Sequence, residues 1–227
     1  TIPNNPFLGN IDLVKVYSRA LSAAEISSEY NHTVSNLTMN YTSLSWTEGG
    51  TDLVLYMPFE EGAGAITKDW SRQKSDGLLV NSPAWAAGNR DINTGNGIGF
   101  DGLNNYVSVE DSSSLRFNTG DSITVAAWIN ASGLSSSMTI LAKGRTRATN
   151  LSNYVLRANS QTLEFYYRNS TNGGWNVLAS SANVLNTGVW QYVALTYTFG
   201  TGSSAKMYVN GVEAEATWIS GTGDEAP

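Results

Sequence analysis

The chain has 227 residues, of which 41% are hydrophobic and 14% charged, so it is long enough to bury the core of one large β domain. Its net charge is −6 and it has no cluster of Lys or Arg, which excludes a nucleic-acid-binding protein. Cysteine is absent, which excludes disulfides and thiolate zinc sites. The sequence has no apolar run of 18 residues and no leader that begins with Met, so we expect neither a membrane span nor a signal peptide. We expect a mature product or a fragment.

The first expected elements are a strand and a helix within residues 1–30. NIDLVKVY at 10–17 alternates well enough for one strand. Ser22-Ala23-Ala24-Glu25 fits a capping box, in which the Ser22 hydroxyl accepts from the backbone N–H of Glu25 and the Glu25 carboxylate accepts from that of Ser22. This box predicts a helix of about two turns that reaches Tyr30.

Residues 31–52 have weak periodicity and a Gly pair, which predicts a linker, although LTMNYTSLSW within it also fits an extra edge strand. The glycosylation pattern N-x-[S/T] begins three times within ten residues of this stretch. This clustering predicts an exposed linker in a secreted or cell-surface glycoprotein. The acceptor residues of the whole chain are Asn31, Asn36, Asn40, Asn130, Asn150 and Asn169.

Short β-rich runs between Gly, Asn and Ser clusters follow from residue 53 to 218, which predicts an antiparallel sandwich. SITVAAWI at 122–129 is apolar on both faces, so we expect a central strand. Asn210-Gly211 predicts a two-residue type I′ hairpin turn. The expected strands are 53–59, 122–129, 138–143, 153–158, 162–168, 175–181, 189–197 and 205–218.

The chain resembles a laminin G-like jelly-roll domain of the concanavalin A-like superfamily. LYMPFEEGAGAITKDWS looks like the opening strand of that family, and GIGFDGLNNYVSV looks like its Phe-x-Gly turn into a strand. SITVAAWI, GVWQYVALTY and MYVNGVEA then follow in the family's order. The resemblance implies an all-β fold, an antiparallel two-sheet jelly-roll sandwich with one short helix.

The family's closing segment stands at the beginning of this chain. FLGNIDLVKVYSRALSAAEI at 7–26 is similar to that closing strand and helix, so the chain reads as one domain cut out of phase. We therefore expect three regions: a closing unit (1–30), a linker (31–52) and a jelly-roll body (53–227). The closing unit can complete its own sheet, that of a neighbouring copy, or that of the preceding copy in a tandem array.

We expect the closing strand of one copy to complete the sheet of the next, which makes other copies, head to tail, the main partner. An unfilled place for this strand would expose a sheet edge and an apolar groove that invite another chain. The apolar side chains expected at this contact between copies are Phe7, Leu8, Ile11, Leu13, Val14 and Val16.

Calcium is the one cofactor that the resemblance implies, because many members of this family bind it between the opening and closing segments. Carboxylate and carbonyl oxygens would be its ligands. The best placed carboxylates are Asp12, Asp69 and Asp101. An alternative is that Asp69 and Asp101 only cap turns through Asx hydrogen bonds.

Catalysis is the least favoured function. The single histidine, His32, lies in the expected linker without an organised neighbour, which argues against Ser-His-Asp chemistry. Glu213 and Glu215 would share one face of a strand, as the carboxylates of related glycosidases do, but the third acidic residue of those enzymes is missing. The chain is therefore expected not to be an enzyme.

Aromatic side chains suit stacking on sugars. Trp128 and Trp190 match core positions of the family, whereas the exposed candidates are Trp85, Trp175, Trp218 and either Tyr166 or Tyr167. The sequence thus predicts a non-enzymatic extracellular module with a structural or adhesive role in a surface array or filament. The alternative is a carbohydrate-binding module of a larger secreted enzyme or adhesin.

Overall fold

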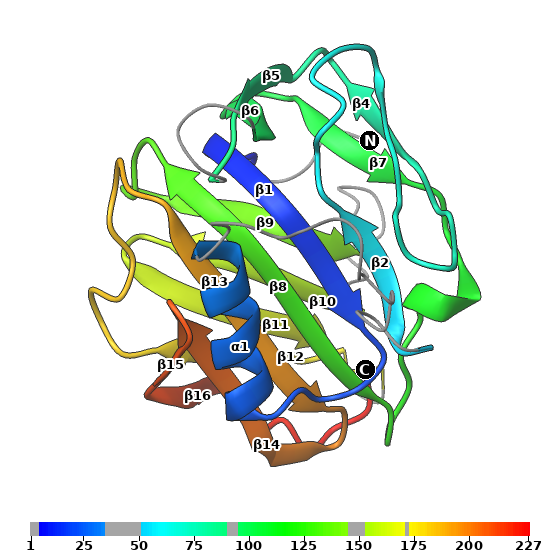
Figure 1. Cartoon of the computed structure of the whole chain (residues 1–227). Helices are drawn as coiled ribbons and strands as arrows, with labels where there is room; N and C mark the ends of the chain where they lie inside the picture. Colours follow the sequence, from blue (N-terminus) through cyan, green and yellow to red (C-terminus); the bar gives the residue numbers. More distant parts are fainter. Residues whose placement is uncertain (1–4, 35–50, 90–94, 145–152, 171–172) are drawn as a thin grey trace.

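A computed structural model of the chain describes residues 5–34, 51–89, 95–144, 153–170 and 173–227 (Figure 1). Within these residues, antiparallel strands form sheets of eight, five and three strands, accompanied by one α-helix. The all-β sandwich is confirmed. The elements are β1 (Leu8–Tyr17), α1 (Ala23–Val34), β2 (Leu53–Met57), β3 (Ile66–Thr67), β4 (Gly77–Val80), β5 (Ala84–Ala87), β6 (Asn96–Asp101), β7 (Tyr106–Val109), a 3-10 turn (Ser113–Leu115), β8 (Ser122–Ala131), β9 (Ser137–Lys143), β10 (Tyr154–Asn159), β11 (Thr162–Arg168), β12 (Trp175–Ser180), β13 (Gln191–Thr198), β14 (Thr201–Val209), β15 (Val212–Ala214) and β16 (Ala216–Ser220).

Strand β1 occupies the middle of the eight-stranded sheet, whose order is β15-β14-β13-β8-β1-β6-β5. One edge of β1 pairs with β8 over most of its length. The other edge pairs with β6 at residues 8–11 and with β2 at residues 14–17. The closing unit therefore completes the sheet of its own chain, which is the first of the three arrangements expected from the sequence.

The alternation within β8 explains its central place. Ile123, Val125 and Ile129 point into the main core of the sandwich, and each is at most 2% exposed. Ala126 and Trp128 point to the opposite face and belong to a second apolar cluster beneath α1. Because both faces of β8 are covered, the expectation of a central strand is confirmed.

The second layer of the sandwich is divided into two sheets. The five-stranded sheet has the order β16-β12-β11-β10-β9, and the three-stranded sheet has the order β3-β4-β7. Both contribute side chains to the core that packs on the eight-stranded sheet, among them Leu156, Phe165 and Leu79. In the described part of the chain β7 and β9 are end strands, so the expected pair of sheets is interrupted between them.

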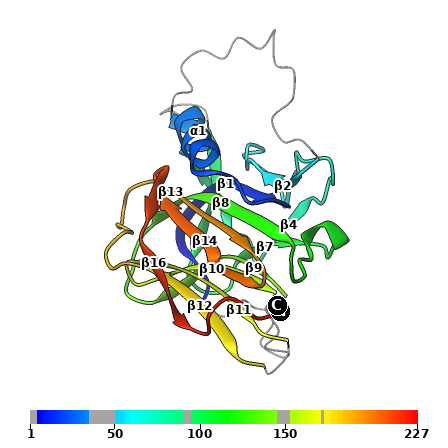
Figure 2. The same ribbon diagram turned by 90° about the horizontal axis from the view of Figure 1, so that it is seen from below.

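Helix α1 covers the outer face of the eight-stranded sheet (Figures 1 and 2). Its capping box is confirmed: the backbone N of Ser22 lies 2.8 Å from Glu25 Oε2, and that of Glu25 lies 3.3 Å from Ser22 Oγ. The Tyr30 ring stacks on Trp128 with centroids 5.6 Å apart. The helix runs to Val34, one turn further than expected, so the backbone of His32 is helical.

The Asn210-Gly211 turn is confirmed, since both residues have positive φ (52° and 76°) and Val209 pairs with Val212. The strand expected over 205–218 is not continuous. β15 ends at Ala214 and β16 begins at Ala216, because the chain passes there from the eight-stranded to the five-stranded sheet. The edge strand considered at LTMNYTSLSW lies outside the described residues.

Candidate functional site

The outer face of the five-stranded sheet carries charged and aromatic side chains. In β11, Leu163, Phe165 and Tyr167 are 0% exposed and lie in the core. Because successive side chains of a strand point to opposite faces, the residues between them point outward. We call the outward cluster on β10, β11 and β12 the arginine–aromatic face; it consists of Arg157, Asn159, Glu164, Tyr166, Arg168 and Trp175.

Two arginines stack on two aromatic rings within this face. The Arg157 guanidinium lies 4.6 Å from the centroid of Tyr166, and the Arg168 guanidinium lies 5.4 Å from that of Trp175. Tyr166 meets Trp175 edge to face at 5.6 Å. The four side chains thus form one continuous row, in which cation–π contacts hold the guanidinium groups against the rings.

A polar network is joined to this row through Glu164. Its carboxylate accepts from Arg157 Nε at 2.7 Å and from Asn159 Nδ2 at 2.7 Å. Ser137 Oγ in turn donates to Asn159 Oδ1 at 2.9 Å. Glu164 is only 3% exposed, so its hydrogen bonds to Arg157 and Asn159 keep the charge paired and hold the arginine in one orientation.

This arrangement suits recognition better than hydrolysis. Trp175 is half-buried, and the neighbouring arginine and asparagine groups are hydrogen-bond donors in fixed positions. A sugar offers these groups an apolar ring face and several hydroxyls. Glycoside hydrolysis requires two carboxylates across the scissile bond, whereas Glu164 is the single carboxylate of the described network.

The structure separates the aromatic candidates. Tyr166 points to the outer face, while Tyr167 is buried and its hydroxyl donates to the Glu225 carbonyl at 2.8 Å. Trp218 packs edge to face on Tyr167, and Trp85 Nε1 donates to the Gly64 carbonyl at 2.9 Å. Trp175 and Tyr166 are thus the two candidates that the fold brings together. The core assignments hold for Trp128, which is 2% exposed, and for Trp190, which packs partly buried under α1.

The pair of glutamates considered for catalysis does not share a strand. Glu213 lies in β15, where its carboxylate is 2.6 Å from Lys206 Nζ. Glu215 follows the end of that strand, and its backbone carbonyl accepts from the backbone N of Ser181. The expectation of a shared face was wrong because the chain changes sheet between them.

The three carboxylates expected to bind calcium do not form one site. Among the described residues, no group of three or more His, Cys, Asp or Glu side chains is placed to hold a metal ion. Asp69 accepts from the backbone N of Ser71 at 2.8 Å, and Asp101 accepts from that of Leu103 at 2.8 Å. These are the turn-capping bonds of the alternative interpretation. Asp12 is fully buried and accepts from the backbone N of Asn89 at 3.0 Å.

The sequon asparagines have different surroundings. Asn31 is exposed in the last turn of α1, and Asn130 is half-buried in β8. Asn169 is 3% exposed in the turn after β11. Asn36, Asn40 and Asn150 lie outside the described residues.

The side chains expected to contact another copy pack within their own chain, with one exception. Leu8 is 40% exposed at the start of β1. The other five are buried by β8, β6, β2 and α1, because β1 lies at the centre of its own sheet: Phe7 (3% exposed), Ile11 (3%), Leu13 (2%), Val14 (7%) and Val16 (0%).

Sequence reasoning missed Arg157, Glu164 and Arg168. The signal was present in TLEFYYR, where alternation places Glu164, Tyr166 and Arg168 on one face. What could not be read from this run is which face is covered. Nor does it show that Arg157 of the neighbouring strand lies opposite Glu164.

The packed antiparallel sheets define a jelly-roll β-sandwich module. None of the helical segments in the described residues is long and apolar enough to span a membrane. A laminin G-type family model, described as the concanavalin A-like lectin/glucanases superfamily, matches residues 100–226, which is more than half of the chain. The chain therefore belongs to this family. Comparisons with curated proteins and with solved structures gave no match.

Proposed function

We propose that the chain is a non-enzymatic extracellular module that binds carbohydrate, and that it does so through the arginine–aromatic face. The observation that carries this proposal is the row of Arg157, Tyr166, Trp175 and Arg168 on the outer face of the sheet. Membership of a lectin-containing superfamily supports a carbohydrate-binding or adhesive role in general. An extracellular location agrees with the sequons and with the usual place of laminin G-like domains.

Trp175 is the residue whose loss should matter most for binding. Its ring is the more accessible of the two on this face, since Tyr166 is only 5% exposed. Stacking of a sugar on an aromatic ring depends on ring area and not on charge. We therefore expect Trp175→Ala to lower glycan affinity at least about tenfold, in line with the loss of a stacked ring contact.

Binding can be measured on an array of neutral and acidic glycans and then by titration calorimetry. Trp70→Ala is the matched control, because Trp70 is 46% exposed but packs on Tyr56, away from this face. Loss of binding in Trp175→Ala alone supports the proposal. Loss of glycan binding in Trp70→Ala alone would mean that the binding site lies elsewhere on the molecule. Absence of binding to every glycan would contradict the proposed function.

A second candidate function is assembly of copies by strand exchange. It is favoured by the central place of β1, which pairs with β8 on one edge and with β6 and β2 on the other. The β1–α1 unit is joined to β2 by residues 35–52. Exchange of this unit between copies would preserve every one of its contacts, in a head-to-tail filament.

A disulfide test distinguishes the two arrangements of β1 because the natural chain has no cysteine. Asn10 and Asn130 are cross-strand partners in β1 and β8. In the double variant Asn10→Cys/Asn130→Cys, pairing within one chain gives an oxidised monomer. Exchange gives covalent oligomers on non-reducing gels, and a purely monomeric product at high protein concentration would contradict assembly by exchange.

A further inference from the structure

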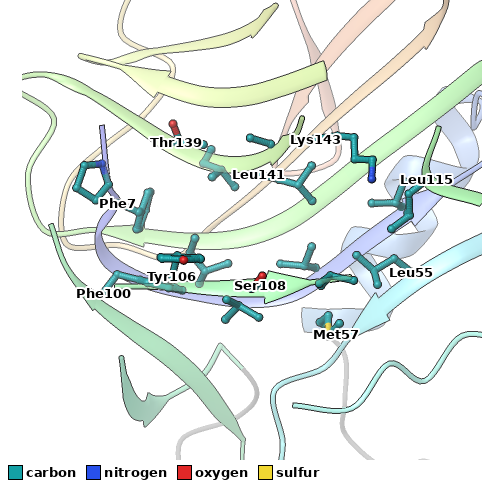
Figure 3. A pocket seen from close by; sticks show the side chains of 18 of the residues that line it. Phe7, Leu55, Met57, Phe100, Tyr106, Ser108, Leu115, Thr139, Leu141 and Lys143 are labelled. Atoms are coloured by element: carbon teal, nitrogen blue, oxygen red, sulfur yellow. The ribbon is translucent and has the colours of Figure 1, made fainter. Parts of the chain in front are cut away.

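A cavity of about 420 Å³, partly open to the surface, lies where the second layer of the sandwich is interrupted (Figure 3). Its floor is the inner face of the eight-stranded sheet, and its sides are the end strands β7 and β9. Folded interiors rarely contain voids much larger than a water molecule. A space of this size is instead typical of pockets that bind small molecules.

The cavity lining is mainly apolar, with Asn105, Ser108 and Thr139 among its polar residues. Phe7, Phe100 and Tyr106 lie at one end, whereas Leu115 and Lys143 lie at the other, with Leu55 and Met57 near them (Figure 3). Between these ends it is lined by side chains of β1, β7 and β9, including Val14, Val107 and Leu141. An apolar, extended space of this kind fits a chain of methylene groups better than a sugar or a peptide rich in polar groups.

One end of the cavity is positively charged. Of the described residues that line it, Lys143 is the one with a charged side chain, and it is 19% exposed. Its ammonium pairs with Asp111, which also pairs with Arg116. The hydrogen bond from Arg116, and to a smaller extent that from Lys143, holds the pKa of Asp111 well below its usual range, so this carboxylate stays ionised. Two cations thus share one anion, which leaves this end able to attract a second anion.

We propose that this cavity binds a single-chain aliphatic carboxylic acid, with its carboxylate at Lys143 and its hydrocarbon chain extending toward Phe7 and Phe100. The carboxylate would share or replace Asp111 as the partner of the Lys143 ammonium. This site is separate from the arginine–aromatic face, because it lies on the core side of the five-stranded sheet and Trp175 on the outer side.

The test compares two probes that differ only in the head group, dodecanoic acid and dodecan-1-ol. Each is titrated into the full chain by displacement of a fluorescent aliphatic probe. Saturable binding of both is expected, with the acid tighter. Lys143→Gln should lower the affinity for the acid at least about tenfold and leave that for the alcohol unchanged, and Asp111→Asn should raise the affinity for the acid because it removes a competing carboxylate.

Three controls make the result decisive. Lys206→Gln removes another lysine that pairs with a carboxylate, Glu213, outside the cavity lining, and should change nothing. Val107→Phe replaces an aliphatic side chain of the cavity lining with a larger aromatic ring and should abolish binding of both probes. Trp175→Ala should leave both affinities unchanged, which separates this proposal from the glycan proposal. Absence of saturable binding, or equal affinity for the acid in the natural chain and Lys143→Gln, would overturn it.

Discussion

The outer faces of the two layers differ in what covers them. On the eight-stranded sheet, outward side chains such as Leu13, Trp128 and Tyr208 are apolar and lie under α1. On the five-stranded sheet, the outward side chains of β10 to β12 include two arginines, a glutamate and a tryptophan. Burial of the first set stabilises the fold, whereas the second set gives an organised polar surface. Damage to the first should therefore affect stability more than damage to the second.

The largest effect on the covered layer is expected from Gly9→Ala. Gly9 has φ +134°, and an added Cβ would lie 2.2 Å from the backbone oxygen of Asn130 in β8. We expect a loss of about 3 kcal/mol or more in the free energy of unfolding, because the backbone is strained and the hydrogen bonds between β1 and β8 are disrupted. Denaturant unfolding measures it.

Gly64→Ala is the control for Gly9→Ala, because Gly64 also has positive φ but no atom lies within 4 Å of its added Cβ. It should cost only about 1 kcal/mol, from backbone strain alone. Equal losses in the two variants would show that β1 does not depend on its close approach to β8.

Removal of the helix contact should have the next largest effect. Ile26 is 0% exposed between α1 and the sheet, so Ile26→Ala should lower the free energy of unfolding by about 3 kcal/mol through lost burial and a cavity. Ser28→Ala, on the exposed side of the same helix, is the control. Glycan affinity should stay unchanged in Ile26→Ala under native conditions. A change in affinity would mean that the two faces are coupled.

A smaller effect on stability is expected from a substitution in the arginine–aromatic face. Arg157→Gln leaves the Glu164 side chain, which is 4% exposed, without its charged partner, and should cost about 2 kcal/mol. Arg116→Gln breaks a pair whose side chains are 63% and 51% exposed and should cost less stability than Arg157→Gln. Thermal unfolding of the two variants tests the ranking, and a larger loss in Arg116→Gln contradicts it.

The smallest effect is a dependence on pH at the start of α1. The pKa of Glu25 is lowered from 4.5 to about 2, mainly by the hydrogen bond from the Arg19 side chain and, to a smaller extent, by the hydrogen bonds from Ser22. Because the folded-state pKa is depressed, this stabilisation is present above pH 4.5 and is lost as the pH falls through about 2.

Glu25→Gln should therefore unfold with less pH dependence in this window. The Glu25 side chain is 44% exposed, so solvent screening keeps the difference below about 1 kcal/mol. Unfolding at a series of pH values measures it, with the exposed Glu215→Gln as the control. A natural chain and Glu25→Gln with parallel pH profiles would contradict this account.

Much of the fold could be predicted from local patterns. The alternation of β8, the Ser22–Glu25 capping box and the Asn210-Gly211 turn each depend on residues close in sequence, and each is confirmed. The break at Glu215 could not be predicted in this way, because AEAT continues the alternation and only the packing of two sheets decides where the chain crosses.

The candidate site was predictable only in part. Trp175 and Tyr166 were candidates because of their residue type, but Tyr167 was equally good until the core fixed which side of β11 faces inward. Arg157 joins the site through its pairing with Glu164 across two strands, and register of this kind does not follow from composition. The three carboxylates expected at a metal site could not be assigned from the sequence either. Each accepts a hydrogen bond from a backbone amide that the fold brings to it.

The central place of β1 has a consequence for how the chain acquires its structure. β1 precedes β8 by more than a hundred residues, as the pairing of Ile11 with Ile129 shows. A growing polypeptide therefore exposes an apolar strand long before its main partner has been synthesised. Such non-local pairing slows folding and leaves the nascent chain open to aggregation. Folding of this chain should accordingly depend on chaperones that shield residues 7–17 until the rest of the domain is complete.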